Sequence, residues 1–246
     1  MAENLASKLG IQSYCFRGFP KAEQIIEGLK ACGVDKLEIC GVHWKPAEQP
    51  DPRVVVEEYR KGGITLSSFG VQAIGDDEKA ARPAFELAKA AGFPVISADV
   101  RGANGLAVAE KLCKEYGKKI AIHNHGRKHR LGPAWALEEL FAKASMNVGL
   151  CLDTAWALDS GDDPLAVAQK FKDRLYGLHL KDFVFDRAGK HQDVVVGTGN
   201  LNLQGMADFL KSINFGGYLT LEYEGDVNNP TPALKKCCEA IRKAFA

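Results

Sequence analysis

The sequence alternates short apolar runs with longer amphipathic runs over its whole length. Expected strands span residues 11–16, 36–40, 64–69, 94–98, 119–123, 147–152, 175–180 and 217–221, and expected helices span residues 21–32, 52–61, 76–91, 106–116, 133–144, 164–171, 203–213 and 232–245. This alternation indicates parallel strands joined by helical crossovers. Because a barrel of eight such units takes roughly 250 residues, we predict an α/β fold, a single (β/α)8 TIM barrel, with residues 1–246 forming one domain.

The composition excludes several classes of partner. A formal net charge of +1 gives no reason to expect a nucleic acid or an anionic membrane surface. No run of about 18 apolar residues is present, and the first eight residues lack the apolar core of a signal peptide. The seven cysteines lack C-x-x-C spacing, as is typical of buried thiols in a reducing compartment. We therefore expect a cytoplasmic protein that binds neither membranes nor nucleic acids.

Four consecutive strands of the expected barrel finish with metal-ligating side chains: His123, Asp153, His179 and Glu222. Active sites of such barrels lie at the carboxyl ends of the strands, so these four are expected to converge. Alone, each would more often be a hydrogen-bonded structural group. Together, two imidazoles and two carboxylates suit Mn²⁺, Fe²⁺, Co²⁺ or Zn²⁺ better than Ca²⁺. The sequence therefore predicts one divalent metal ion held by these four residues.

Other polar side chains are expected around this centre. The predicted catalytic residues are Glu222, His125 and Lys181, and the predicted substrate contacts are Glu38, His43, Trp156 and Arg187. Lys181 suits either a substrate oxyanion or an ion pair with a carboxylate such as Glu38, and His43 suits either a sugar pocket or loop packing. We interpret Glu224, His129 and His191 as solvated. The glycines of Gly197-Thr-Gly199 either cradle an anion or only permit a turn.

Five motifs of the chain resemble the xylose isomerase-like barrel superfamily, the sugar phosphate isomerase/epimerase group. They are Ile122-His-Asn-His-Gly126, Cys151-Leu-Asp-Thr154, Gly177-Leu-His-Leu-Lys-Asp182, Val196-Gly-Thr-Gly199 and Gly216-Gly-Tyr-Leu-Thr-Leu-Glu222. The resemblance covers essentially the whole chain. It implies metal ligands at His123, Asp153, His179 and Glu222, substrate contacts at Glu38 and Lys181, and a homodimer.

Two residues depart from the patterns of that superfamily. Its epimerases usually carry Glu at the position of His123, where it works with the last-strand Glu on the opposite face of the substrate. An imidazole that ligates a metal is no longer a free base, so His123 places this two-carboxylate mechanism in doubt. Trp156 stands where the DNA-repair endonuclease branch needs the His of an Asp-x-x-His motif, and no basic stripe supports duplex binding.

These residues lead to one expected function and two alternatives. We expect a metal-dependent isomerase or epimerase that abstracts a proton next to the carbonyl of a sugar, keto-sugar or cyclitol, through an enediolate that the metal stabilises. The same intermediate can expel a β-leaving group, so the nearest alternative is a dehydratase or lyase acting on a keto-sugar or inosose. The alternative of another class is a sugar-binding barrel without catalysis.

Overall fold

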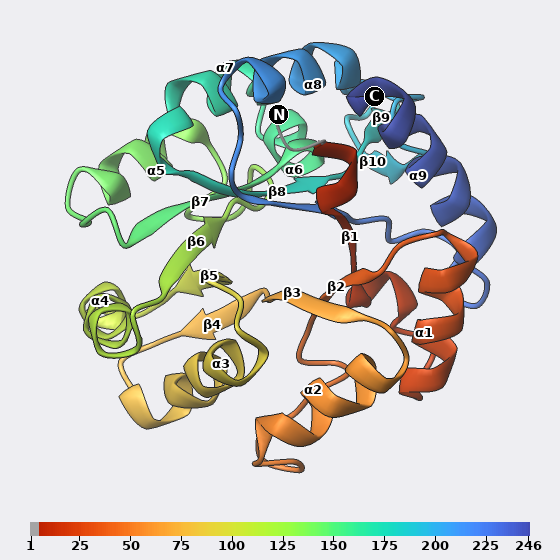
Figure 1. Ribbon diagram of the computed structural model, residues 1–246. Helices are drawn as coiled ribbons and strands as arrows, with labels where there is room; N and C mark the ends of the chain where they lie inside the picture. Colours follow the sequence, from red (N-terminus) through yellow and green to blue (C-terminus); the bar gives the residue numbers. More distant parts are fainter. Residues whose placement is uncertain (1–4) are drawn as a thin grey trace.

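The computed structural model describes residues 5–246 and shows a ring of parallel strands surrounded by helices (Figure 1). The strands of the ring are β1 (Leu9–Gln12), β2 (Lys36–Ile39), β3 (Thr65–Phe69), β4 (Gln72–Ile74), β5 (Val95–Val100), β6 (Lys119–His123), β7 (Val148–Asp153), β8 (Leu175–Leu180) and β11 (Tyr218–Leu221). The helices are α1 (Ala22–Ala31), α2 (Pro52–Lys61), α3 (Glu78–Ala91), α4 (Gly105–Tyr116), α5 (Ala134–Phe141), α6 (Thr154–Asp159), α7 (Pro164–Lys170), α8 (Leu203–Ser212) and α9 (Thr231–Phe245).

The ring closes through its third strand, whose first part, β3, pairs with β2 and whose second part, β4, pairs with β5. The hydrogen-bonded order runs β3-β2-β1-β11-β8-β7-β6-β5-β4, and only Gly70 and Val71 separate β3 from β4 in the chain. The hydroxyl of Ser68 on β3 also donates to the Val95 carbonyl oxygen on β5, at 3.1 Å. The strands β3 and β4 are therefore two halves of one barrel strand, and the predicted TIM barrel is confirmed, with its third strand divided.

Three local predictions were wrong. The first strand ends at Gln12, whose side chain accepts a hydrogen bond from the Tyr14 amide and caps a 3₁₀ turn over Ser13–Phe16. The short helix α6 was missed because its six residues carry no periodic signal of their own. The segment 183–202, expected to be irregular, contains an antiparallel hairpin of β9 (Phe183–Phe185) and β10 (His191–Asp193).

The apolar residues of the strands and helices form one large buried cluster that holds the barrel together. Successive side chains of a strand point to opposite faces, so the apolar residues that alternate with His179 on β8, namely Leu178 and Leu180, join that cluster. All seven cysteines are buried and free, as predicted. Within residues 5–246, no helix combines the length and apolar character that a bilayer crossing requires.

Candidate metal centre

Four side chains meet at the carboxyl end of the barrel: His123, Asp153, His179 and Glu222. One ligand atom from each lies within 4.8 Å of the others. His179 Nδ1 is 2.8 Å from Glu222 Oε2 and 3.1 Å from His123 Nε2, and His123 Nε2 is 3.5 Å from Asp153 Oδ2. The structure thus brings together all four residues that the sequence predicts as ligands.

The strand register explains why these residues converge. Asp153 is the β7 partner of His179 on β8, and His123 lies at the end of β6 beside Cys151. The Asn124 side chain then ties the two strand ends, since it accepts from the Asp153 amide at 2.8 Å and donates to the Asp153 carbonyl at 3.0 Å. Asp153 Oδ1 also caps α6 by accepting from the Trp156 amide at 2.8 Å, which leaves Oδ2 for the cluster.

The chemistry of this cluster fits a divalent cation. Asp153 Oδ2 has no hydrogen-bond partner, and its side chain is fully shielded from water. A carboxylate oxygen in such a place normally needs a cation or a hydrogen-bond donor. Burial lowers the pKa of His123, but Asp153 and Glu222 outweigh it and raise that pKa to about 9. Burial raises the pKa of Glu222, yet Lys181 and His179 hold it well below its usual range. The carboxylates therefore stabilise positive charge at this site. A bound ion would supply that charge in place of the protons that the imidazoles otherwise carry.

Glu38 supports this cluster from below and is not among the residues that line the cavity above it. Its side chain is fully buried, and its Oε2 accepts from His179 Nε2 at 2.8 Å and from the Thr220 hydroxyl at 3.1 Å. A Cβ at Gly70 would lie 2.7 Å from Glu38 Oε1, so glycine is needed for this close approach. We infer that Glu38 orients His179 with Nδ1 toward the cluster, and its contact with a substrate stays a prediction.

The substitution Glu38→Gln is expected to weaken metal binding roughly 10- to 100-fold, because a neutral acceptor orients and polarises His179 less strongly. Competition with a fluorescent Zn²⁺ chelator measures the affinity. Glu139→Gln, an equal charge change at an exposed position on α5, provides the control. Equal affinities for the two variants would contradict the orienting role of Glu38.

A cavity of about 410 Å³ opens above the cluster and contains several predicted site residues. Its walls include the ligands His123 and Glu222 together with His125, Trp156 and Glu224. Burial and the neighbouring His123 lower the pKa of His125 to about 3, so this imidazole is neutral at physiological pH. Its Nδ1 is buried without a partner. His125 and Trp156 are therefore placed where a substrate would contact them.

Lys181 is almost completely buried behind two residues of the cavity wall, Glu224 and Trp156. It forms an ion pair with Glu224, and its ammonium lies 5.2 Å from the centroid of the Trp156 ring. Burial lowers the pKa of Lys181, but Glu222 and Asp153 outweigh it, so the group stays charged. Of the two alternatives for Lys181, the structure shows the ion pair, and its partner is Glu224 in place of Glu38. Glu224 is therefore not simply solvated. Its position two residues after Glu222, on the same face, was the available signal.

The remaining candidates lie away from the cluster. His43 contacts the Ser13 hydroxyl at 3.0 Å and the Phe19 carbonyl at 3.2 Å, which is loop packing. Arg187 is exposed in the turn of the β9–β10 hairpin and lines neither this cavity nor the larger one beside it. His191, interpreted above as solvated, instead stacks on Phe183 with ring centroids 4.5 Å apart.

The glycine motif in the long loop after β8 does cradle an anion, but the anion belongs to the protein. The Asp182 carboxylate accepts from the backbone amides of Gly197, Gly199 and Leu201, each at 2.9 Å. A Cβ at Gly199 would lie 2.5 Å from that carboxylate. This loop is therefore fastened to the end of β8, next to Lys181. Sequence reasoning also missed Gln12, the last residue of β1, and Tyr14 in the 3₁₀ turn after it, which line the cavity and carried no charge signal.

The structure combines a TIM barrel with a four-residue cluster at its carboxyl end that could hold a metal ion. Residues 26–244 match the family model described as xylose isomerase-like TIM barrel. The chain therefore belongs to the xylose isomerase-like TIM barrel family.

Similar proteins agree with this assignment. The inosose dehydratase of Clostridium tetani is 28% identical over 149 residues, which cover 53% of this chain and 48% of that protein. The chain thus spans about half the length of the curated relatives it matches. The crystal structure of the IOLI protein with a bound zinc atom superposes with a TM-score of 0.76 at 17% identity, over 96% of this chain and 97% of that one. The 3-keto-D-glucoside 4-epimerase YcjR of Escherichia coli gives 0.71 at 17% identity, over 96% and 99%. At this identity, the two structures show the shared fold.

Proposed function

We propose that this protein is a metal-dependent enzyme that removes a proton next to the carbonyl of a sugar, keto-sugar or cyclitol. The observation that carries the proposal is the buried His123–Asp153–His179–Glu222 cluster at the floor of a cavity. A divalent ion held there would polarise the substrate carbonyl and make the adjacent carbon more acidic. The zinc of the IOLI structure supports the same kind of ion here.

Glu222 is the proposed base. Its Oε2 faces the two imidazoles, so the second carboxylate oxygen is the one that would take the proton from the substrate carbon. Lys181 would place its positive charge near the oxygen on which negative charge develops. His125, neutral and with a buried unpaired nitrogen, would hydrogen-bond a substrate hydroxyl.

The arrangement favours elimination of water over two-base epimerisation. An epimerase that reprotonates the opposite face needs a second free acid/base group, and here His123 occupies the expected position as a ligand. Dehydration needs one base and a proton for the departing hydroxyl. The inosose dehydratases among the relatives support this choice. Isomerisation is the second candidate, because one base can return the proton on the same face.

Incubation of a keto-cyclitol such as an inosose in D₂O tests the proposal. We expect an unsaturated ketone to appear by ultraviolet absorbance, with the rate depending on added Mn²⁺, Co²⁺ or Zn²⁺. Deuterium incorporation without the unsaturated product would identify an isomerase or epimerase instead. The protein could also show neither exchange nor elimination, on this substrate and on keto-hexoses, and bind less than half an equivalent of metal. That combination would favour the non-catalytic sugar-binding barrel. The homodimer, the cytoplasmic location and the absence of nucleic-acid partners stay predictions.

A further inference from the structure

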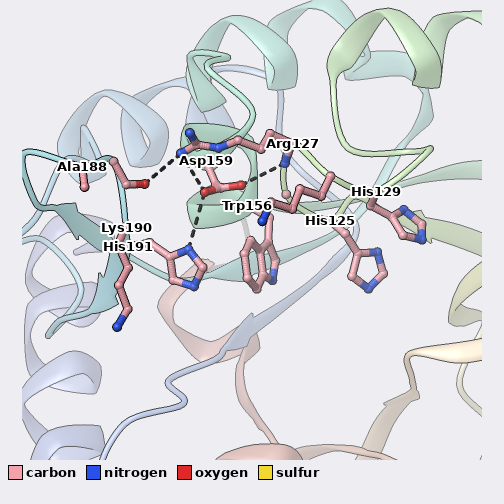
Figure 2. Close-up of a pocket in the computed structure, with 11 residues that line it drawn as sticks. His125, Arg127, His129, Trp156, Asp159, Ala188, Lys190 and His191 are labelled. Atoms are coloured by element: carbon pink, nitrogen blue, oxygen red, sulfur yellow. Dashed lines mark hydrogen bonds and ion pairs between the residues drawn. The ribbon is translucent and has the colours of Figure 1, made fainter.

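A larger cavity of about 700 Å³ adjoins the proposed active site. It shares His125 and Trp156 with the smaller cavity, and its other walls come from the loop after β6, from α6 and from the β9–β10 hairpin. Figure 2 shows the Trp156 ring between the rings of His191 and His125. The two cavities therefore adjoin, with His125 and Trp156 in the wall that they share.

The charges of the larger cavity are unbalanced. Its walls carry three cationic side chains, Arg127, Lys128 and Lys190, against one carboxylate, Asp159. That carboxylate is already satisfied, since it accepts from the Arg127 amide at 2.9 Å and from Arg127 Nη2 at 3.0 Å, and lies 3.5 Å from His191 Nδ1. Within residues 5–246, no ion pair joins Lys128 or Lys190 to a carboxylate. Two ammonium groups are therefore free to bind an anion.

The loop that carries Arg127 and Lys128 is held in place by contacts on both sides. Arg127 Nη2 donates to the Gly189 carbonyl in the hairpin at 3.2 Å, so the two walls are joined. Arg130 Nη2 donates to the buried Asp99 carboxylate at the end of β5, at 2.6 Å. A Cβ at Gly126 would lie 2.3 Å from a carboxylate oxygen of α6, which explains the glycine at this close approach. The basic cavity is thus a built feature of the carboxyl face of the barrel.

We propose that this cavity binds an anionic group, a carboxylate or a phosphate, carried by a substrate whose reacting carbons lie at the metal centre. The proposal rests on the proposed function and adds the substrate class: an acidic or phosphorylated sugar derivative that is longer than a single neutral ring. The Trp156 ring supplies an apolar face for the part of the substrate between the two sites. Lys128 and Lys190 are both exposed at the rim of this cavity, where their ammonium groups can turn toward an anion.

Titration calorimetry of the metal-loaded protein with inorganic phosphate, and separately with acetate, tests this proposal. The test variant is the double substitution Lys128→Gln and Lys190→Gln. The control is Lys235→Gln with Lys236→Gln, which changes the net charge equally at exposed positions on α9. Any binding of the anions to the metal itself is common to all three proteins, so the difference between the variants reports the cavity.

We expect the Lys128→Gln, Lys190→Gln variant to bind at least one anion roughly tenfold more weakly than the wild type and the control do. Tighter binding of phosphate would indicate a phosphate ester, and tighter binding of acetate a carboxylate. Equal affinities in all three proteins, or no heat from either anion, would overturn the proposal. Neither titration requires turnover, so the anion-binding result can be interpreted even if the inosose assay is negative.

Discussion

The substitution Asp153→Asn is expected to abolish stable metal binding and to lower turnover by roughly a thousandfold, since a bound cation supplies several kcal/mol to a reaction of this kind. Asp153 offers Oδ2, buried and without a partner, to the cluster, while its Oδ1 caps α6. Asparagine retains a capping oxygen but presents a neutral amide to the ion. The loss is therefore expected in metal content and turnover, with little change in the thermal midpoint of the metal-free protein.

Asp163→Asn is the matched control for this substitution. Asp163 caps α7 by accepting from the Leu165 amide at 3.0 Å, the same role that Asp153 has at α6, but it is exposed and does not belong to the four-residue cluster. Metal analysis by mass spectrometry, turnover and thermal unfolding compare the two variants. Retention of one equivalent of metal by the Asp153→Asn protein would contradict the assigned ligand set.

The substitution Lys181→Met is expected to lower turnover about 100- to 1000-fold while the bound metal stays in place. A buried donor aimed at developing negative charge has an effect of about this size in other enzymes. Methionine preserves most of the apolar stem and removes the ammonium, which lies 5.2 Å and 5.6 Å from the centroids of the Trp156 and Phe183 rings. Steady-state kinetics and metal content measure the two effects separately.

Glu224→Gln distinguishes a catalytic from a structural role for Lys181. It removes the ion pair with a residue of the cavity wall but keeps the ammonium of Lys181. If the lysine acts on the substrate, the Glu224→Gln protein keeps most of its turnover. If the ion pair only holds the loop after β11, both variants lose stability and turnover to a similar extent, and the assignment of Lys181 is wrong.

The convergence of these four side chains was predictable because two local rules coincide in this sequence. Side chains alternate along a strand, and parallel strands of a barrel end on the same face. His123, Asp153, His179 and Glu222 each terminate an apolar run, so their convergence follows from the eightfold rhythm without any knowledge of contacts. The structure brings one ligand atom of each of these residues within 4.8 Å of the others.

The roles of the surrounding charges could not be predicted in the same way. The depth of a residue in the barrel depends on the stagger of neighbouring strands, which no local pattern encodes. That stagger places Glu38 under His179 and away from the cavity above, and it pairs Lys181 with Glu224. The division of the third strand at Gly70 likewise follows from the need to pair with both β2 and β5.

The sequence by itself determined the barrel, the face on which its site lies and the four side chains that could hold a metal, because periodicity and strand order are properties of the chain. Only the tertiary structure decided which carboxylate orients His179, which one neutralises Lys181, and that a second, basic cavity lies beside the first. The walls of that cavity come from three segments separated by up to about sixty residues, and packing alone brings them together.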